Sequence, residues 1–560
     1  MLEQIVDDSE GADKGLFEEQ DAWKHACPTS ALIERDIRAQ VNKILAYLRE
    51  PDFGRSFFAV EKCLIPLVLA LGRLFFAFYL AWRHQHSGAD LRFWQKKGYS
   101  FGSPQPRLLG TTFGKVRYWR TYMTDASSAG IYPLDLALRL TADGFSMHVI
   151  TLAARMASRM SYDHVVEILR LFLLWSPSKS SVEKAVMGLG KYTEDWFLNA
   201  PPPEGDGEVL VTQIDSKAIP TATEEELGKR RGKRPENPYP GSQRHRGRVK
   251  RQRRGSKKRR AEGDKSKNGK AAHVVVQYTL KKAIGPDGKP VLLGPINRKS
   301  YGTHVSKRRA FLMARHLADK RGFAENSGKT HQFVGDGDED LARLKREYLP
   351  EAVQTLDVMH VIEYLWEAGR LIFKDDRGAL VRWIKRMKKL LYGGEALQMA
   401  VKIAAAAAAV PKTGPGNKQK GCRLGEIRDY IFKRVDQMNY QWLRGNDLEI
   451  ASGSVEGAVN HLVAIRFDKG GMRWIKERAQ ALLQLRCIDQ NREWELFTAF
   501  VHDQVSHEAM TQGEAQRILS IRPAPLEKGS YNAALSALTN VCTRTPCPVP
   551  KKSKHELLFF

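Results

Sequence analysis

Two aspartates far apart in the chain have the types and settings needed for metal chemistry. Asp215 ends the apolar run VLVTQIDS (209–216), and Asp336 follows a second apolar run that contains Phe333 and Val334. Carboxylates at the ends of neighbouring strands are held rigidly and can meet although their positions in the chain are distant. We therefore expect Asp215 and Asp336 to lie side by side.

Glu456 is the residue best placed to complete such a site. It lies in the segment SGSVEGAVNHLVAIRF (452–467), just after two serines that can cap a helix. Three carboxylates select Mg²⁺ or Mn²⁺, and two such ions promote in-line phosphoryl transfer. Asp215, Asp336 and Glu456 are therefore predicted to be both metal ligands and catalytic residues.

The acidic stretch around Asp336 has a second use. Gly337 would let the backbone approach a substrate, because glycine has no side chain. The acids at 338–340 are expected to stabilise the positive end of the following helix. Asp338 remains the alternative to Asp336 as the metal ligand.

Net charge indicates a polyanionic partner. The 560 residues, enough for two to four domains, include 90 Lys and Arg against 63 Asp and Glu, which gives a formal charge of +27. Nucleic acid is the leading partner class, and a merely soluble basic protein is the alternative. Acid at the centre of such a protein fits a site where phosphodiester and carboxylates meet through a metal.

The basic residues cluster. Residues 229–260 hold sixteen Lys and Arg and one acid, a composition that stays unfolded alone and suits a phosphate backbone. A solvated linker is the alternative. The predicted DNA-contacting residues of this block are Arg251, Arg253, Arg254, Lys257, Lys258, Arg259 and Arg260.

Cytoplasmic localisation is expected. The six cysteines are scattered and form no zinc half-site, which indicates a reducing cytosol, and the acidic first twenty residues lack a signal peptide. Residues 63–82 are apolar enough for a membrane span. Since Arg73 at their centre would cost ~2.5–3.5 kcal/mol on insertion, we predict a buried core helix instead.

Periodicity predicts a mainly helical first part. Residues 1–30 resemble a loose tail, and 31–200 are predicted to be helical apart from a short strand at 113–123. Three helices are expected within 146–197. Short helices with polar turns suit a helix-turn-helix DNA reader, although generic three-helix packing would have the same pattern.

The remaining elements predict a mixed core interrupted by helices. The core, 208–360, should run strand, strand, strand, helix, strand, helix, strand, with strands at 209–216, 273–280, 290–296, 332–334 and 352–358. This order departs from a doubly wound sheet. A helical insertion should fill 361–452, and the final core helices 453–497. Residues 498–560 are expected to form a weakly ordered tail apart from a helix near 531–540.

Several of these segments together resemble a known family. VTQIDSKAI, VGDGDEDL, TLDVMH and SGSVEGAVNHLVAIRFDKGGMRW are similar to the DDE transposases of bacterial insertion sequences, in the Mutator-like branch that includes the Kra group. The resemblance spans about 100–497. It implies an RNase H-like core, that is, an α+β or α/β fold with a mixed sheet and flanking helices. It also implies an all-helical insertion before the last catalytic acid and a helical N-terminal DNA-binding region.

The resemblance also implies residue roles. Asp215, Asp336 and Glu456 match the catalytic triad, and two Mg²⁺ or Mn²⁺ ions would be its cofactors. Asp357 and His360 match a D-x-x-H element after the fifth strand. The last residues of the match are expected to support the site or contact DNA; they are Arg466, Gly471, Met472, Arg473 and Trp474. Trp474 would stack on a DNA end or, alternatively, be a core residue.

Such an enzyme would bind terminal inverted repeats and target DNA, cut a strand with water and join the freed 3′-hydroxyl to the target. By resemblance it would act as a homodimer or higher oligomer associated with the bacterial nucleoid. Two alternatives remain: an RNase H-like structure-specific nuclease, and a non-catalytic DNA-binding protein derived from a transposase.

Overall fold

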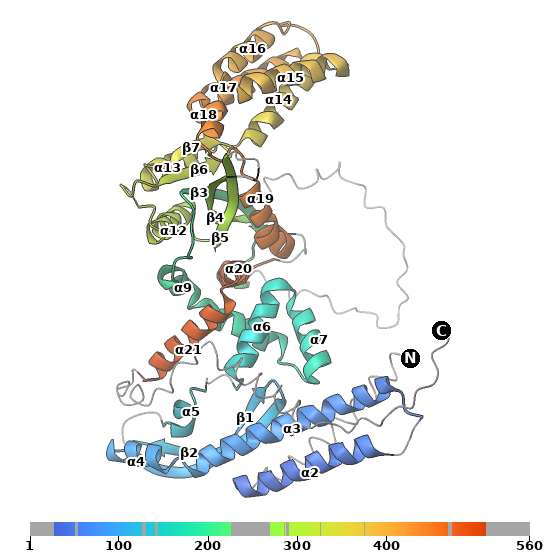
Figure 1. The fold of residues 1–560 in the computed structure, drawn as a ribbon, viewed down its shortest axis with the longest axis vertical. Helices are drawn as coiled ribbons and strands as arrows, with labels where there is room; N and C mark the ends of the chain where they lie inside the picture. Colours follow the sequence, from blue (N-terminus) through green and yellow to red (C-terminus); the bar gives the residue numbers. More distant parts are fainter. Residues whose placement is uncertain are drawn as a thin grey trace.

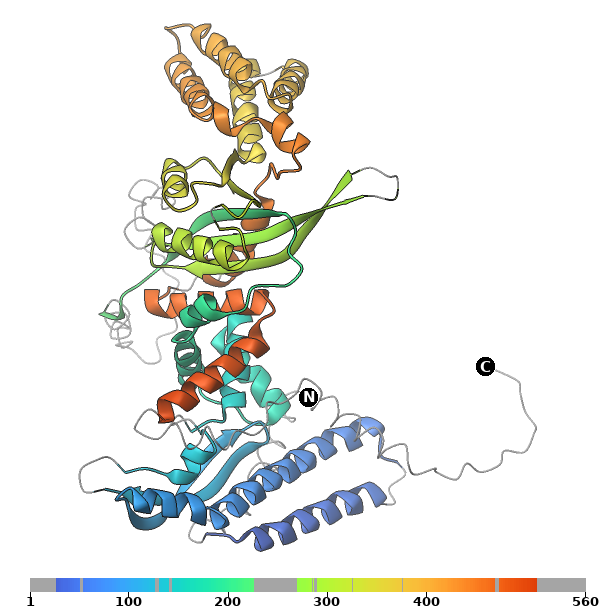
Figure 2. The same ribbon diagram turned by 60° about the vertical axis from the view of Figure 1, so that its left-hand side comes forward.

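The molecule is elongated, and its parts follow one another along the long axis (Figure 1). An N-terminal unit lies at one end, a helical lobe at the other, and a β-sheet between them; a turned view gives the same arrangement (Figure 2). The computed structural model describes residues 27–50, 54–125, 130–140, 144–225, 269–284, 286, 290–324, 326–374, 376–468 and 473–510.

The N-terminal unit combines helices with a β-hairpin around a small core of its own. Its core side chains are Ile33, Ala77, Leu80, Ala81, Leu109, Val116, Tyr118 and Leu134. Its elements are α2 (Ser30–Arg49), α3 (Phe57–Gln85), α4 (Gly88–Lys96), β1 (Ser100–Thr111), β2 (Gly114–Thr124) and α5 (Pro133–Ala137).

The prediction of a mainly helical region over 31–200 is wrong for this hairpin. The expected strand at 113–123 is present as β2, but its partner β1 was not predicted. β1 contains Gly102, Pro104 and Pro106, which weaken a strand pattern, and it forms by antiparallel pairing from Thr111 opposite Gly114 to Ser100 opposite Thr124.

Helix α3 is not the buried core helix that the sequence predicts. It is long and apolar enough to cross a membrane by length and composition, and only 22% of its most apolar stretch is buried. Its small residues Ala70, Ala77 and Ala81 face the unit together with buried Arg73, while Phe57 and Phe58 are 80% and 73% exposed. Small side chains and Leu80 therefore make the buried contact, while the large aromatic side chains Phe75, Tyr79 and Trp82 remain exposed.

The predicted helix-turn-helix region consists of four helices rather than three. They are α6 (Met147–Arg159), α7 (Tyr162–Leu173), α8 (Lys179–Gly190) and α9 (Thr193–Asn199). The first three begin at serine caps, Ser146, Ser161 and Ser178, whose side chains accept backbone N–H groups. These helices share one continuous core with the sheet, so they are not a separate module.

The central sheet has five strands in the order β5-β4-β3-β6-β7. Its strands are β3 (Val209–Pro220), β4 (Gly269–Ile284), β5 (Pro290–Thr303), β6 (Thr330–Gly335) and β7 (Val353–Leu356). β3 pairs antiparallel with β4 and parallel with β6, and β6 pairs parallel with β7. The mixed α+β fold class and the predicted order of strands and helices are confirmed, with α12 (Lys307–Lys320) and α13 (Glu339–Tyr348) between the strands.

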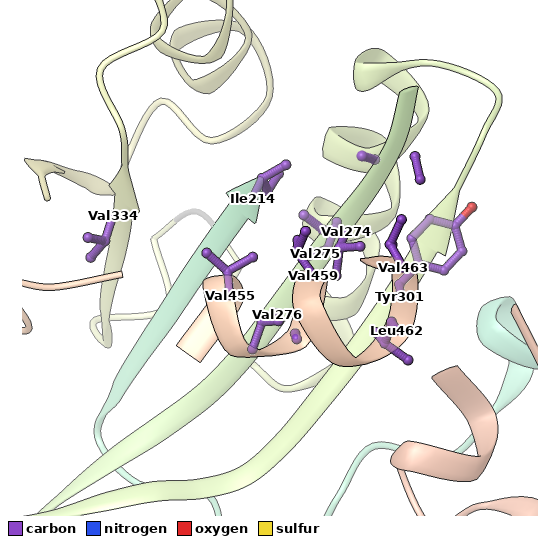
Figure 3. Close-up of a cluster of buried hydrophobic side chains, with 14 of the residues drawn as sticks. Ile214, Val274, Val275, Val276, Tyr301, Val334, Val455, Val459, Leu462 and Val463 are labelled. Atoms are coloured by element: carbon purple, nitrogen blue, oxygen red, sulfur yellow. The ribbon is translucent and has the colours of Figure 1, made fainter. Parts of the chain in front are cut away.

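Helices cover both faces of the sheet. On one face, the amide of Gln277 in β4 donates to the Ala314 carbonyl of α12. On the other lie α19 (Gly453–Val459), the π-helix η2 (Asn460–Asp468) and α20 (Lys476–Gln490). Val455, Val459 and Val463 of α19 and η2 lie over β3 and β4 (Figure 3). This apolar layer fixes where α19, and with it Glu456, lies on the sheet.

The predicted helical insertion is present as a lobe that leaves and rejoins the sheet at one point. Its elements are α14 (Val358–Phe373), α15 (Arg377–Tyr392), α16 (Ala396–Ala408), α17 (Asn417–Phe432), η1 (Val435–Gln437) and α18 (Tyr440–Gly445). The Val358 N–H at its start donates to the Ile450 carbonyl at its end over 2.9 Å.

The expectation of a weakly ordered tail from 498 is wrong for its first residues, 498–510. Helix α21 runs Trp494–Met510, and Trp494, Phe497 and Val501 are buried against the core. Their spacing of three and four residues is the apolar stripe of a helix. Of the tail expected at 1–30, residues 1–26 lie outside the described residues, and Ser30 already begins α2. The helix expected near 531–540 and the whole basic block, 229–260, also lie outside them.

Candidate metal centre

Three aspartates follow matching positions of three adjacent parallel strands. Gln213 of β3 is in register with Val334 of β6, so Asp215 and Asp336 each come two residues further along. Gly335 is in register with Leu356, so Asp336 and Asp357 each come one residue further. Since neighbouring strands lie ~4.8 Å apart, the three backbones bring these carboxylates to one edge of the sheet.

Two buried glutamines fasten the segment before Glu456 over the same edge. Gln213 donates its amide to the Ala451 carbonyl at 3.0 Å and accepts the Val455 N–H at 3.0 Å. Gln332 of β6 donates to the Glu449 carbonyl and accepts the Glu449 N–H. Side chains alternate along a strand, so Asp215 shares the face of Gln213. Glu456 therefore starts from a segment that is hydrogen-bonded to the strands of both aspartates.

Gln213 and Gln332 were not among the predicted site residues. Both are 0% exposed, and both interrupt apolar strand runs, in VTQID and HQFVGD. A buried glutamine needs partners for its amide, because an unpaired polar group is expensive in a core. A polar residue in an otherwise apolar strand was thus the signal that could have identified them.

Negative charge converges on Asp215. Burial raises the pKa of the Asp215 carboxyl above its ordinary value, a hydrogen bond from the Ser216 N–H opposes this, and the charges of Asp336 and Glu456 raise it further. The structure thus brings the three predicted acids within electrostatic reach of one another. A site that gathers like charges fits a divalent cation.

Asp215→Asn should make the metal-free protein more stable at neutral pH. Because the pKa of Asp215 is higher in the folded than in the unfolded chain, ionised Asp215 destabilises the fold above its folded pKa. That penalty vanishes as the pH falls below its unfolded pKa. The Tm of the variant should therefore exceed that of the wild type at pH 7, and the two should converge in acid. Equal values at pH 7 would contradict the crowding of charge at this site.

The turn after β6 is held by the helical lobe. Tyr430 of α17 donates its hydroxyl to the Asp336 carbonyl at 2.7 Å, and Arg434 Nε donates to the Gly337 carbonyl at 2.8 Å. Gly337 has φ +85°, and an added Cβ would lie 2.6 Å from the Tyr430 hydroxyl. The positive φ and these contacts give glycine a structural reason at this turn, and the predicted approach of substrate stays a prediction.

Asp338 has the helix-capping position predicted for it. It is the N-cap of α13, its carboxylate accepts the Asp340 N–H at 2.8 Å, and it forms an ion pair with Lys307. Burial acts to raise its pKa, but the hydrogen bond and positive charge of Lys307, together with the backbone N–H groups of α13, outweigh burial and lower the pKa. Its charge is therefore already matched by a cation, which favours Asp336 as the metal ligand.

Asp357 and His360 lie beside Glu456. Asp357 is fully buried, caps α14 through the Met359 N–H and accepts the Ser452 hydroxyl at 2.5 Å. His360 Nε2 lies 3.9 Å from Asp357 Oδ2 and 4.0 Å from Glu456 Oε1. The D-x-x-H pair is thus part of the same cluster, and Ser452, which also approaches Glu456 at 3.4 Å, is a further member.

Trp474 and Arg466 are buried, so the expected direct DNA contacts are wrong for them. Trp474 is 7% exposed, packs 4.8 Å from the Phe467 ring and bridges to Thr221 at the end of β3. Arg466 is 6% exposed, with its guanidinium 4.8 Å above the Trp474 ring. Both side chains are part of the packing around η2. The alternative that Trp474 is a core residue therefore agrees with the structure. Arg473 remains partly exposed.

Trp474→Ala should destabilise the protein without a specific effect on DNA ends. Removing a buried tryptophan leaves a cavity and lowers the free energy of unfolding by about 3–5 kcal/mol. Arg473→Ala, the neighbouring change, should alter it by less than about 0.5 kcal/mol. Urea unfolding measures both. If the Trp474→Ala protein had normal stability but failed to bind DNA ends, Trp474 would instead be a DNA-contacting residue.

No protein-family model matches the chain, and the curated proteins include no significant match. Its function must therefore be argued from the fold and the site. The predicted DNA contacts Arg251, Arg253, Arg254, Lys257, Lys258, Arg259 and Arg260 lie outside the described residues, as do Gly471 and Met472.

Proposed function

We propose that the protein is a DDE transposase that cuts and joins DNA with the help of divalent metal ions. The observation that carries the proposal is the register of the sheet, which aligns Asp215 and Asp336 on adjacent parallel strands beneath the segment that bears Glu456. Three carboxylates at one sheet edge are the donor set of a two-metal phosphoryl-transfer site.

The strand order supports an RNase H-like core as part of this proposal. In chain order the five strands pair as third, second, first, fourth and fifth, with two antiparallel pairs followed by two parallel ones. This agrees with the core that the resemblance to insertion-sequence transposases implies. The helical lobe lies between β7 and Glu456, where that resemblance expects an insertion.

The chain's own residues supply binding and orientation. Asp215, Asp336 and Glu456 would hold the ions, for which their carboxylates are suitable oxygen donors. When bound, divalent ions activate an attacking oxygen and stabilise the leaving oxygen. The Ser452 hydroxyl, held by Asp357, also approaches Glu456, and Tyr430 orients the Asp336 turn. The excess of basic residues would bind the DNA backbone.

The predicted partners follow from this activity. The protein would bind terminal inverted repeats and target DNA as a dimer or higher oligomer and would be associated with the bacterial nucleoid. The most direct test uses a labelled duplex that carries the terminal repeat beside the gene, an unlabelled plasmid and Mg²⁺. We expect cleavage at the repeat end and transfer of the label to the plasmid.

Two other results would each overturn the proposal. Cleavage without transfer of the label would identify a nuclease on the same core. A retarded DNA band with neither cleavage nor transfer would identify a DNA-binding protein. Omitting Mg²⁺ should stop both steps but preserve the retarded band, since phosphate contacts are made by other residues.

A further inference from the structure

We infer that Asp357, His360 and Glu456 form a binding position for a divalent transition-metal ion that accepts an imidazole nitrogen. This position adjoins Asp215 and Asp336, and the inference rests on the proposed function in taking their surroundings as the reaction centre. The carboxylate triad accounts for oxygen ligands alone, whereas this cluster adds a nitrogen donor.

The geometry suits one ion. One ligand atom from each of the three residues lies within 4.8 Å of the others. His360 Nε2 is 3.9 Å from Asp357 Oδ2 and 4.0 Å from Glu456 Oε1. Ligands of one tetrahedral ion with bonds of ~2.0–2.2 Å are roughly 3.3–3.6 Å apart, a few tenths of an ångström closer than these pairs. Small movements of Glu456 and His360, whose side chains are 54% and 35% exposed, would bring all three ligand atoms to that spacing around buried Asp357.

The two protein segments that supply these ligands are joined to each other. Asp357 and His360 are one turn apart at the start of α14, where residues three apart share a helix face. The Ser452 hydroxyl lies 2.5 Å from Asp357 Oδ2 and 3.4 Å from Glu456 Oε1. Ligating carboxylates in metal sites have hydrogen-bond partners of this kind, which fix their orientation.

The His360 ring gives an independent indication. Its Nδ1 lies 3.7 Å from Glu363 Oε2, on the side away from the cluster, while Nε2 faces Asp357 and Glu456. Metal-binding histidines almost always direct the other ring N–H to a carboxylate, carbonyl or water, which leaves the ligating nitrogen unprotonated. Glu363 is thus placed to accept a hydrogen bond from Nδ1 after a small shift, which would leave Nε2 for an ion.

The donor set predicts ion preference. Mg²⁺ favours oxygen ligands and retains its waters, whereas Mn²⁺ and later transition ions accept imidazole together with carboxylates. Mn²⁺ should therefore bind the whole protein more tightly than Mg²⁺, and His360 should be responsible for the difference.

Mn²⁺ itself is the probe. Pulsed electron paramagnetic resonance of the full chain with Mn²⁺ should detect coupling to a ¹⁴N nucleus, and His360→Ala should abolish this coupling. The same change should weaken Mn²⁺ binding in calorimetry at least about tenfold, the range for losing metal-site interactions, while Mg²⁺ binding changes little. Circular dichroism checks folding. Glu363→Gln, the matched variant, should weaken Mn²⁺ binding but retain the nitrogen coupling.

The inference is overturned if wild-type protein with Mn²⁺ shows no nitrogen coupling, or if the coupling survives in His360→Ala. The experiment also separates it from the proposed function. Nitrogen coupling in a protein that never joins DNA strands would remove the transposase proposal and leave the ion site. Strand joining by a protein without such coupling would do the reverse.

Discussion

Asp215→Asn, Asp336→Asn and Glu456→Gln are each expected to slow Mg²⁺-dependent strand cleavage at least about a thousandfold, a loss of ~4 kcal/mol of transition-state stabilisation. Each amide keeps the size of the carboxylate but removes the charge that attracts a metal ion. Binding to the terminal repeat should stay nearly unchanged, because phosphate contacts lie elsewhere. Gel assays of cleavage and of retardation measure the two effects separately.

Asp338→Asn is the matched control for Asp336→Asn. Asparagine caps a helix as well as aspartate does, so α13 should remain intact and cleavage should continue near the wild-type rate. If Asp338→Asn stopped cleavage and Asp336→Asn did not, the ligand would be Asp338. Any variant of the triad that cleaved normally would exclude its residue from the site.

Replacing residues 229–260 with an equally long Gly/Ser segment should weaken DNA binding and flatten its dependence on salt. The change removes sixteen cations and one acid. Each phosphate contact contributes about 0.9 to the slope of log K against log salt, so losing six contacts would flatten it by about 5. Keeping the segment at equal length preserves the length of the connection between β3 and β4. Titrations at several salt concentrations give the slope.

Arg423→Gln provides the control for loss of positive charge. Arg423 already pairs with Glu367 and Glu426 within the lobe, so its removal should leave the salt dependence unchanged. An unchanged slope for the Gly/Ser protein as well would mean that the basic block is a linker and that other residues bind the phosphates.

The elements around the aspartates could be predicted because their sequence signals are local. VLVTQIDS and HVVVQYTL are dense in β-branched residues, and their strands are buried on both faces. Asp336 directly follows β6 as expected, whereas the prediction that Asp215 ends the first strand is wrong, because β3 continues to Pro220 by pairing with β4. Even the position of Glu456 in the first turn of a helix follows from the serines before it, although Ser452 gives its hydroxyl to Asp357 instead of capping the helix.

The features that failed depend on contacts between distant segments. β1 forms because β2 pairs with it, and its own proline-containing sequence does not predict a strand. The exposed face of α3 could not be inferred from apolar content, because composition does not say which side is covered. Gln213 and Gln332 gain their role only when residues 449–455 cross above them. Such pairings are properties of the assembled fold.

The closed base of the lobe has a mechanical consequence. The two ends of the lobe meet at the Val358–Ile450 hydrogen bond beside Asp357, and the Tyr440 hydroxyl anchors the lobe to the Leu356 carbonyl of β7. Tyr430 and Arg434 also connect the lobe to the turn at Asp336 and Gly337. A force on the tip of the lobe would thus be transmitted to the Asp336 turn and to the start of α14. Because both ends of the lobe lie together, its helices can be lengthened without changing the order of the strands in the sheet.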